Sequence, residues 1–141
     1  MKIKGFTLIE LWIVIGIISI LASFAILRYL TYQEKAKVNT YALPIARACV
    51  MDILNFCTEH NGTTSIVNAL PSLSNCPGNG TNGTKVTPGG NVTLSYPNQI
   101  ICNNSAPQNG LYINATLEGA SYYKAKCGYE LNSLTCSIVS Q

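Results

Sequence analysis

Apolar and polar residues follow one another along this chain in successive patterns, and each pattern predicts a different kind of structure. Residues 6–27 are almost uniformly apolar, and Glu10 is the one ionisable side chain among them. As a helix this stretch is about 33 Å long, which is enough to cross a lipid bilayer. Because it is hydrophobic on nearly all sides, it must lie in lipid or in a bundle of similar helices.

Residues 28–60 continue the helical composition, but their apolar side chains form a single face. They recur at spacings of three and four, at Val38, Ala42, Ile45, Cys49, Ile53 and Phe56. Pro44 removes one backbone hydrogen bond, and we expect it to bend the helix rather than end it, because the pattern resumes at once. Asn61 and Gly62 then provide a plausible end to the helix.

The remaining residues, 61–141, predict a loop followed by a sheet. Residues 61–90 are rich in Asn, Gly, Thr, Ser and Pro and have no sustained period, so we expect a loop. Alternation at 92–96 and 111–117, together with the segments 121–130 and 133–139, predicts about four antiparallel strands, and the apolar residues 100–102 follow a turn at Pro97-Asn98. The expected fold is therefore α+β, with a long N-terminal α-helix packed on a small antiparallel β-sheet.

Six cysteines, all after residue 48, indicate an oxidising compartment and three disulfides, which six cysteines can form in 15 ways. One pair follows from register. If 121–130 and 133–139 form a hairpin turning at Leu131 and Asn132, Cys127 faces Cys136. Cys49 and Cys57 lie two helical turns apart, about 12 Å, and cannot join each other. For them we favour Cys57–Cys76 and Cys49–Cys102.

A lone carboxylate in an apolar helix costs roughly 2.5–3.5 kcal/mol on insertion scales, so Glu10 needs a partner. Cleavage after Gly5 would create one, because the new ammonium of Phe6 would lie one turn from Glu10. In an assembly, the ammonium of one subunit could then meet Glu10 of its neighbour.

The sequence MKIKG/FTLIELWIVIGIISILASFAILRYLTYQEKA resembles the N-terminus of type IV pilins and pseudopilins. The resemblance implies a leader, residues 1–5, that a prepilin peptidase removes between Gly5 and Phe6, and N-methylation of Phe6. It also implies that the subunit is drawn from the inner membrane into a helical filament by a partner machine. A secretory signal is the competing interpretation, since Lys2 and Lys4 precede the apolar run and Ser23-Phe24-Ala25 resembles a cleavage site. The early glutamate and the length of the run argue against it.

The chain has a formal charge of +3, which removal of Lys2 and Lys4 lowers to +1. We therefore expect no strongly basic surface, and the leader lysines act as positive-inside determinants that send the later residues outward. Lys124 and Lys126 share a strand face, with Lys85 as a candidate neighbour, but this is weak support for DNA binding. A solvated sheet edge explains them better.

The residues favour a structural role over catalysis. His60 is the single histidine, and its proximity to Cys57 is better explained by a disulfide and a helix end. No CxxC spacing or acidic loop suggests a metal, and we expect no cofactor.

Asn-x-Ser/Thr triplets begin at six asparagines. The first of them, Asn61, is preceded by Glu59 and resembles the acceptor of bacterial N-glycosylation, although plain solvation is the leading interpretation. The six are Asn61, Asn79, Asn82, Asn91, Asn103 and Asn114.

We therefore expect a pilin-like structural subunit that becomes part of a surface filament after processing in the inner membrane. Within that family, major pilin, minor pilin and pseudopilin of a secretion or DNA-uptake system remain open. A membrane-anchored or secreted adhesin, or a nucleic-acid-binding module that never polymerises, is the alternative from another class. A thiol oxidoreductase is the last alternative, and it would require free thiols.

Overall fold

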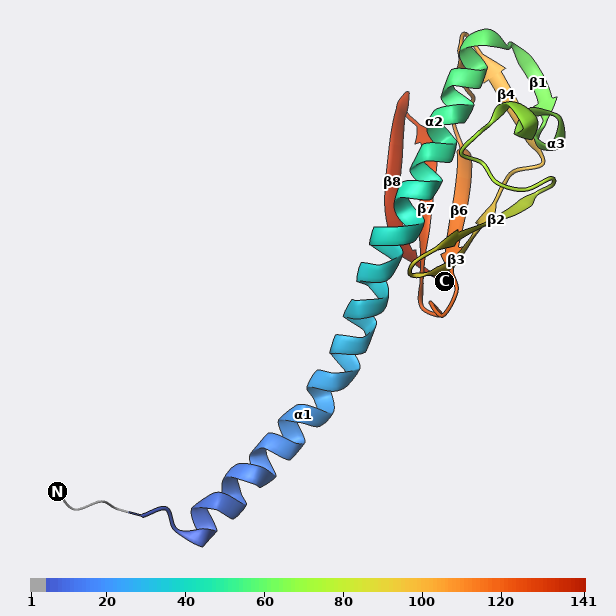
Figure 1. The fold of residues 1–141 in the computed structure, drawn as a ribbon. Helices are drawn as coiled ribbons and strands as arrows, with labels where there is room; N and C mark the ends of the chain where they lie inside the picture. The colour runs from blue at the N-terminus through green and yellow to red at the C-terminus, as the bar shows by residue number, and fades with distance from the viewer. Residues whose placement is uncertain (1–4) are drawn as a thin grey trace. The chain divides into compact units, whose positions relative to one another are not determined.

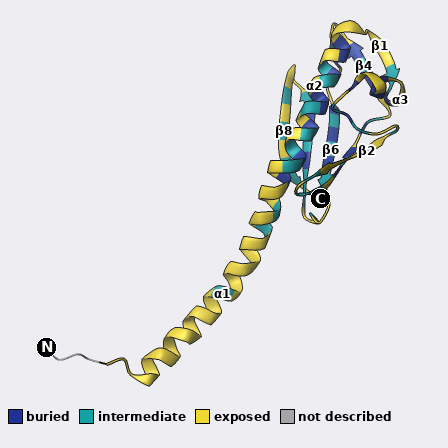
Figure 2. Ribbon diagram, viewed as in Figure 1, coloured by how far each residue is buried: buried dark blue, intermediate teal, exposed yellow. Residues whose placement is uncertain are grey.

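The computed structural model of the protein describes residues 5–141, which divide into two compact units after Gln33. The first unit consists mainly of α1 (Leu8–Lys37), whose side chains are largely exposed along its length (Figure 1, Figure 2). Trp12, for example, has 68% of its surface exposed. By length and composition, the helical run that begins at Leu8 could cross a membrane. Among the residues that the structure describes, no side chain of α1 is buried.

A π-helical turn, Val38–Ala42, joins α1 to α2 (Leu43–Glu59). The Leu43 N–H donates a hydrogen bond to the Val38 carbonyl, five residues earlier instead of four. The wide turn directly precedes Pro44, which has no N–H. The regular pattern of backbone hydrogen bonds is therefore interrupted at a position where the proline would remove one bond in any case. Pro44 does not end the helix, as the resumed periodicity predicted.

A five-stranded antiparallel sheet in the order β2-β3-β6-β7-β8 forms the larger part of the second unit. Residues of α2 contact β6, β7 and β8, and the buried side chains of helix and sheet form one core. This arrangement confirms the predicted α+β fold, although the strands outnumber those expected from the sequence. The strands are β2 (Asn82–Thr87), β3 (Gly90–Ser95), β6 (Leu111–Leu117), β7 (Tyr123–Glu130) and β8 (Ser133–Ser140).

A second, three-stranded sheet contains β1 (Gly62–Ser65), β4 (Gln99–Asn103) and β5 (Ala106–Pro107). Between β1 and β2 lie a short helix, α3 (Ile66–Ala69), and a 3₁₀ turn, Leu70–Ser72. The expectation that residues 61–90 form a loop was therefore wrong in part. Their polar composition carries no strand period, and they gain order from distant partners, as when β1 pairs with β4 and β2 with β3.

The helix face was predicted well. Val38, Ala42, Cys49, Ile53 and Phe56 are buried, whereas Ile45 is only partly buried. The buried face of the helix is broader than the expected spacing of apolar residues suggested, because it also includes Ala46, Val50 and Cys57. Figure 2 shows this buried stripe of α2 facing the sheet.

The structure contains three disulfides, and the Cys127–Cys136 pair is the one expected from the hairpin register. The other two expected pairs were wrong, because Cys49 joins Cys76 and Cys57 joins Cys102.

Two contacts between residues that are far apart along the chain explain why Cys49 and Cys57 have partners other than those expected. The Asp52 carboxylate accepts hydrogen bonds from the backbone N–H and side-chain amide of Asn75, at 2.7 and 3.0 Å. These bonds hold the loop that contains Asn75 and Cys76 beside the turn of α2 that carries Cys49. Cys76 therefore lies within reach of Cys49. Register pairs Cys102 with Gly62, just beyond the end of α2, which places it near Cys57.

Candidate functional site

The predicted processing site precedes the helix. Gly5 and Phe6 are exposed and lie outside regular secondary structure, because α1 begins only at Leu8. The bond between them therefore belongs to an irregular stretch of chain rather than to a helical turn. The lysines expected to hold the N-terminus in the cytoplasm, Lys2 and Lys4, lie outside the described residues.

Thr7 and Glu10 bind each other at the start of α1. The Glu10 Oε2 atom accepts hydrogen bonds from the backbone N–H and the hydroxyl of Thr7, at 2.9 and 2.8 Å, and the Glu10 N–H donates to the Thr7 hydroxyl at 3.4 Å. This reciprocal pattern is a capping box, which satisfies otherwise unpaired N–H groups at a helix N-terminus. Glu10 therefore has a local structural role that the sequence reasoning missed. The signal was present as Thr-x-x-Glu.

The family model for the prokaryotic N-terminal methylation motif matches residues 1–26. The chain therefore carries the prokaryotic N-terminal methylation motif at its N-terminus. It is also 49% identical over 67 residues to fimbrial protein EcpB of Eikenella corrodens. That match covers 46% of this chain and 40% of the relative, so the chain spans well under half of the length of the relative that it matches. No solved structure matches the chain. The expected resemblance to type IV pilins is thus confirmed at the N-terminus.

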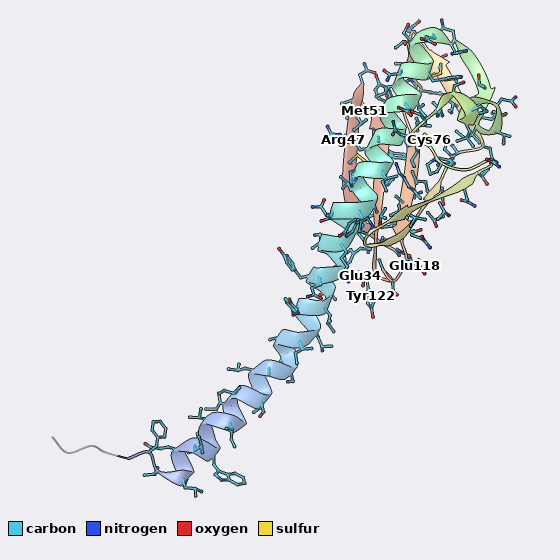
Figure 3. The ribbon with its side chains drawn as sticks, viewed as in Figure 1. Glu34, Arg47, Met51, Cys76, Glu118 and Tyr122 are labelled. Carbon is cyan, nitrogen blue, oxygen red and sulfur yellow. A yellow bond between two sulfur atoms is a disulfide. The ribbon has the colours of Figure 1, made fainter. Side chains whose placement is uncertain are left out.

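Beyond this pilin-type segment, Glu34 joins the last turn of α1 to the connection between β6 and β7. Its Oε1 atom accepts hydrogen bonds from the backbone N–H groups of Tyr122 and Tyr123, at 2.5 and 3.2 Å. Gln141 holds the same connection through its side-chain amide, which donates to the carbonyls of Ala120 and Tyr123 at 3.2 and 3.0 Å. Figure 3 shows Glu34 and Tyr122 at this end of the sheet. No local sequence pattern pointed to Glu34, because its partners lie far along the chain.

Replacing Glu34 with alanine is expected to lower the free energy of unfolding of the second unit by about 1–2 kcal/mol, since two charge-assisted bonds to backbone N–H groups are lost. Thermal unfolding of the full chain, followed by the near-ultraviolet circular dichroism of tyrosine, measures the change. Lys35→Ala is the matched control, because Lys35 is the exposed neighbour. Equal effects of the two substitutions would show that Glu34 does not anchor the connection.

The residues that superficially suggested catalysis have structural partners. Cys57 is disulfide-bonded, and the His60 ring stacks on Phe56 with the ring centroids 4.1 Å apart. The Nδ1 atom of His60 also lies 3.1 Å from the Phe56 carbonyl oxygen. Cys57 therefore holds no thiol for His60 to activate, and all cysteines of the described residues are paired.

The three lysines considered for DNA binding do not form one surface. Lys124 and Lys126 lie on β7, which is paired on both sides, so the expectation that they mark a sheet edge was wrong. Lys85 pairs with buried Val92 and so lies on the other face of the sheet. Lys126 stacks over the Tyr112 ring at 3.7 Å. The Glu130 carboxylate lies beside the Tyr112 hydroxyl and raises the pKa of that tyrosine, and burial of the hydroxyl raises it further. Because Lys126 stacks on the same tyrosine, an acidic group also lies close to this lysine.

Proposed function

We propose that this chain is a structural subunit of a type IV pilus-like filament. The N-terminal methylation motif over residues 1–26 is the observation that carries the proposal, and the relationship to a fimbrial protein supports it. The subunit is first held in the inner membrane by residues 6–27 and then becomes part of an extracellular filament. Prepilin peptidase and a pilus-assembly machine with an ATPase and a membrane platform are its expected partners.

The exposed apolar surface of α1 supports assembly through helix packing. Large apolar side chains are exposed along the whole helix, including Ile9 at 68%, Leu21 at 64% and Leu27 at 66%. A surface of this kind is stable only in lipid or against other helices. In the filament, the α1 helices of neighbouring copies supply that cover through close van der Waals contact.

Glu10 sets the axial position of each subunit in this proposal. After cleavage, Phe6 carries an ammonium group, which pairs with Glu10 of the neighbouring subunit. The capping box occupies Oε2 of Glu10, and a carboxylate has a second oxygen with which to accept the ammonium. A subunit in the wrong register would bury an unpaired charge, which costs more than a correct pair contributes.

Asn61 is the proposed site of glycan attachment. It is exposed and lies between the last residue of α2 and the first residue of β1, outside regular structure. The following Gly62 has a φ of +102°, a conformation that favours glycine and turns the chain away from the helix. The acceptor amide is therefore presented on an open connection, with Glu59 two residues earlier at the end of the helix.

Intact-mass and N-terminal peptide analysis of the protein from its native cells tests this function. We expect a chain that begins at N-methylated Phe6 and lacks six hydrogens because of its three disulfides. A chain beginning at Ile26, after cleavage at the Ser23-Phe24-Ala25 site, would instead identify an ordinary secreted domain, and the filament proposal would fall.

A further inference from the structure

A groove on the five-stranded sheet has no part in the proposed assembly. Its floor is a row of threonines in register on three adjacent strands, since Thr84 of β2 pairs with Thr93 of β3, and Thr93 pairs with Thr116 of β6. Buried Val92 and Leu94 point to the opposite face, against the core, so the row lies on the face turned away from α2. We name this site the threonine groove.

The threonine groove is large enough for a small ligand. Its rim is formed by Asn91, Glu118 and Gln141, and its volume, which is open to solvent, is about 540 Å³. Ligand sites in proteins typically measure about 300–1,000 Å³. Ala120, which is partly buried, adds a small apolar surface beside the polar groups, whereas the side chain of Leu117 belongs to the core.

The floor of the groove offers both donors and acceptors. The hydroxyls of Thr84 and Thr93 lie 3.3 Å apart and share one hydrogen bond, which leaves a proton of the pair to donate. The Thr116 hydroxyl donates to the Thr93 carbonyl at 3.3 Å, so its oxygen lone pairs are left to accept. A ligand with neighbouring hydroxyl groups can satisfy both kinds of group at once.

The rim is held rigidly by the turn that follows β6. The Glu118 N–H donates to the Asn91 carbonyl at 2.8 Å, and the Asn91 N–H donates to Glu118 Oε2 at 3.3 Å. Gly119 has a φ of +81°, and the Ala120 N–H donates to the Leu117 carbonyl at 3.0 Å. Figure 3 labels Glu118 at this turn. A carboxylate held in this way loses little conformational entropy when a ligand binds.

The groove also accounts for part of a sequence feature that the proposed function leaves unexplained. Three Asn-x-Thr triplets lie on β2, β3 and β6, at 82–84, 91–93 and 114–116. On a strand, residues two apart share a face, so each triplet places its amide and its hydroxyl side by side. The triplets thus build one polar sheet surface, which is a reason for their frequency other than modification.

We propose that the threonine groove binds a neutral saccharide. Sugar hydroxyls match the threonine hydroxyls, the carboxylate and the carboxamides, while Ala120, which is only partly buried, offers an apolar contact for the C–H face of a sugar ring. The residues lining the groove, all within the described part of the chain, include Glu118 but no cation. Anionic sugars are therefore disfavoured by an unpaired like charge.

Calorimetric titration of the full processed protein tests this proposal, in a zwitterionic detergent because sugar-based detergents would compete. The probes are maltohexaose, chitohexaose and mannohexaose, with hexagalacturonate as the anionic comparison. We expect at least one neutral probe to bind with a Kd of about 0.1–1 mM. The combined substitution Thr93→Val and Thr116→Val is expected to weaken binding about 10-fold or more, since hydroxyls are lost and the side-chain shape is kept.

Thr135→Val is the matched control, because Thr135 is an exposed threonine of β8 outside the groove. Glu118→Gln provides a second variant with an intact floor and is also expected to weaken binding. Circular dichroism and the mass of the disulfide-bonded chain check that each variant is folded. Absence of binding by all neutral probes up to about 10 mM would overturn the proposal. So would unchanged binding in the groove variants, an equal loss in Thr135→Val, or preferential binding of hexagalacturonate.

Discussion

Replacing Glu10 with glutamine is expected to abolish filament formation while leaving the folded second unit unchanged. Glutamine can still accept the hydrogen bonds of the capping box, so the start of α1 is preserved. The charge, however, is lost, and the neighbouring Phe6 ammonium would be buried without a partner at a cost of about 3–5 kcal/mol. That cost corresponds to a fall of roughly 150- to 5,000-fold in the equilibrium constant for adding each subunit.

The measurement compares filaments sheared from cells with the subunit retained in membranes, counted by electron microscopy and quantified by immunoblotting. Thr7→Ala is the matched control. It removes the hydroxyl that binds Glu10, at a cost of about 1 kcal/mol to the helix start, but keeps the charge. We expect this variant to form filaments. Normal filaments from Glu10→Gln would refute the charge-pairing proposal, and equal loss in both variants would assign Glu10 a capping role instead.

Removing the Cys57–Cys102 disulfide is expected to cause the largest loss of stability among the three cross-links. The paired residues are 45 apart in sequence, against 27 for Cys49–Cys76 and 9 for Cys127–Cys136. On the chain-entropy model, the double substitution Cys57→Ala and Cys102→Ala costs about 4 kcal/mol, whereas loss of Cys127–Cys136 costs about 3 kcal/mol. Alanine is chosen because both cysteines are buried, and a serine hydroxyl would lack a partner.

Chemical unfolding of the full chain in detergent compares these two double variants under the same conditions. A larger loss of stability for Cys127→Ala with Cys136→Ala would contradict the expected order. Peptide mapping without reduction tests the connectivity independently. A peptide linking Cys57 to Cys76 would support the pair expected from the sequence alone and show that the Asp52–Asn75 contact does not position the loop.

Features fixed by local periodicity could be predicted from the sequence. The buried stripe of α2 follows the three-and-four spacing of apolar residues, and Cys127 opposes Cys136 because the turn at Leu131 and Asn132 sets the hairpin register. The pilin-type motif is contiguous, so it too could be recognised. In each case a short stretch of chain contains all the necessary information.

Features that depend on contacts between segments distant along the chain could not be predicted in the same way. Asp52 lies outside the apolar spacing of the helix, yet its carboxylate anchors Asn75 and thereby selects the partner of Cys49. Glu34 likewise accepts hydrogen bonds from residues some 88 positions later. The threonine groove needs the register of three strands, two of which, β3 and β6, are separated along the chain by β4 and β5. Such contacts are set by tertiary packing rather than by the local pattern.

The bond between Cys57 and Cys102 also determines how the subunit carries load. Tension along the chain passes from one sulfur to the other and bypasses the backbone between them, a separation of 45 residues. That backbone would otherwise extend by about 150 Å when drawn out. Even if a strong pull separated the sheet from the helix, β1, α3, β2 and β3 would remain in a closed covalent loop. Under tension, such a subunit can lengthen only by the part of the chain outside this loop. The cross-linked residues stay close together and can refold when the tension is released.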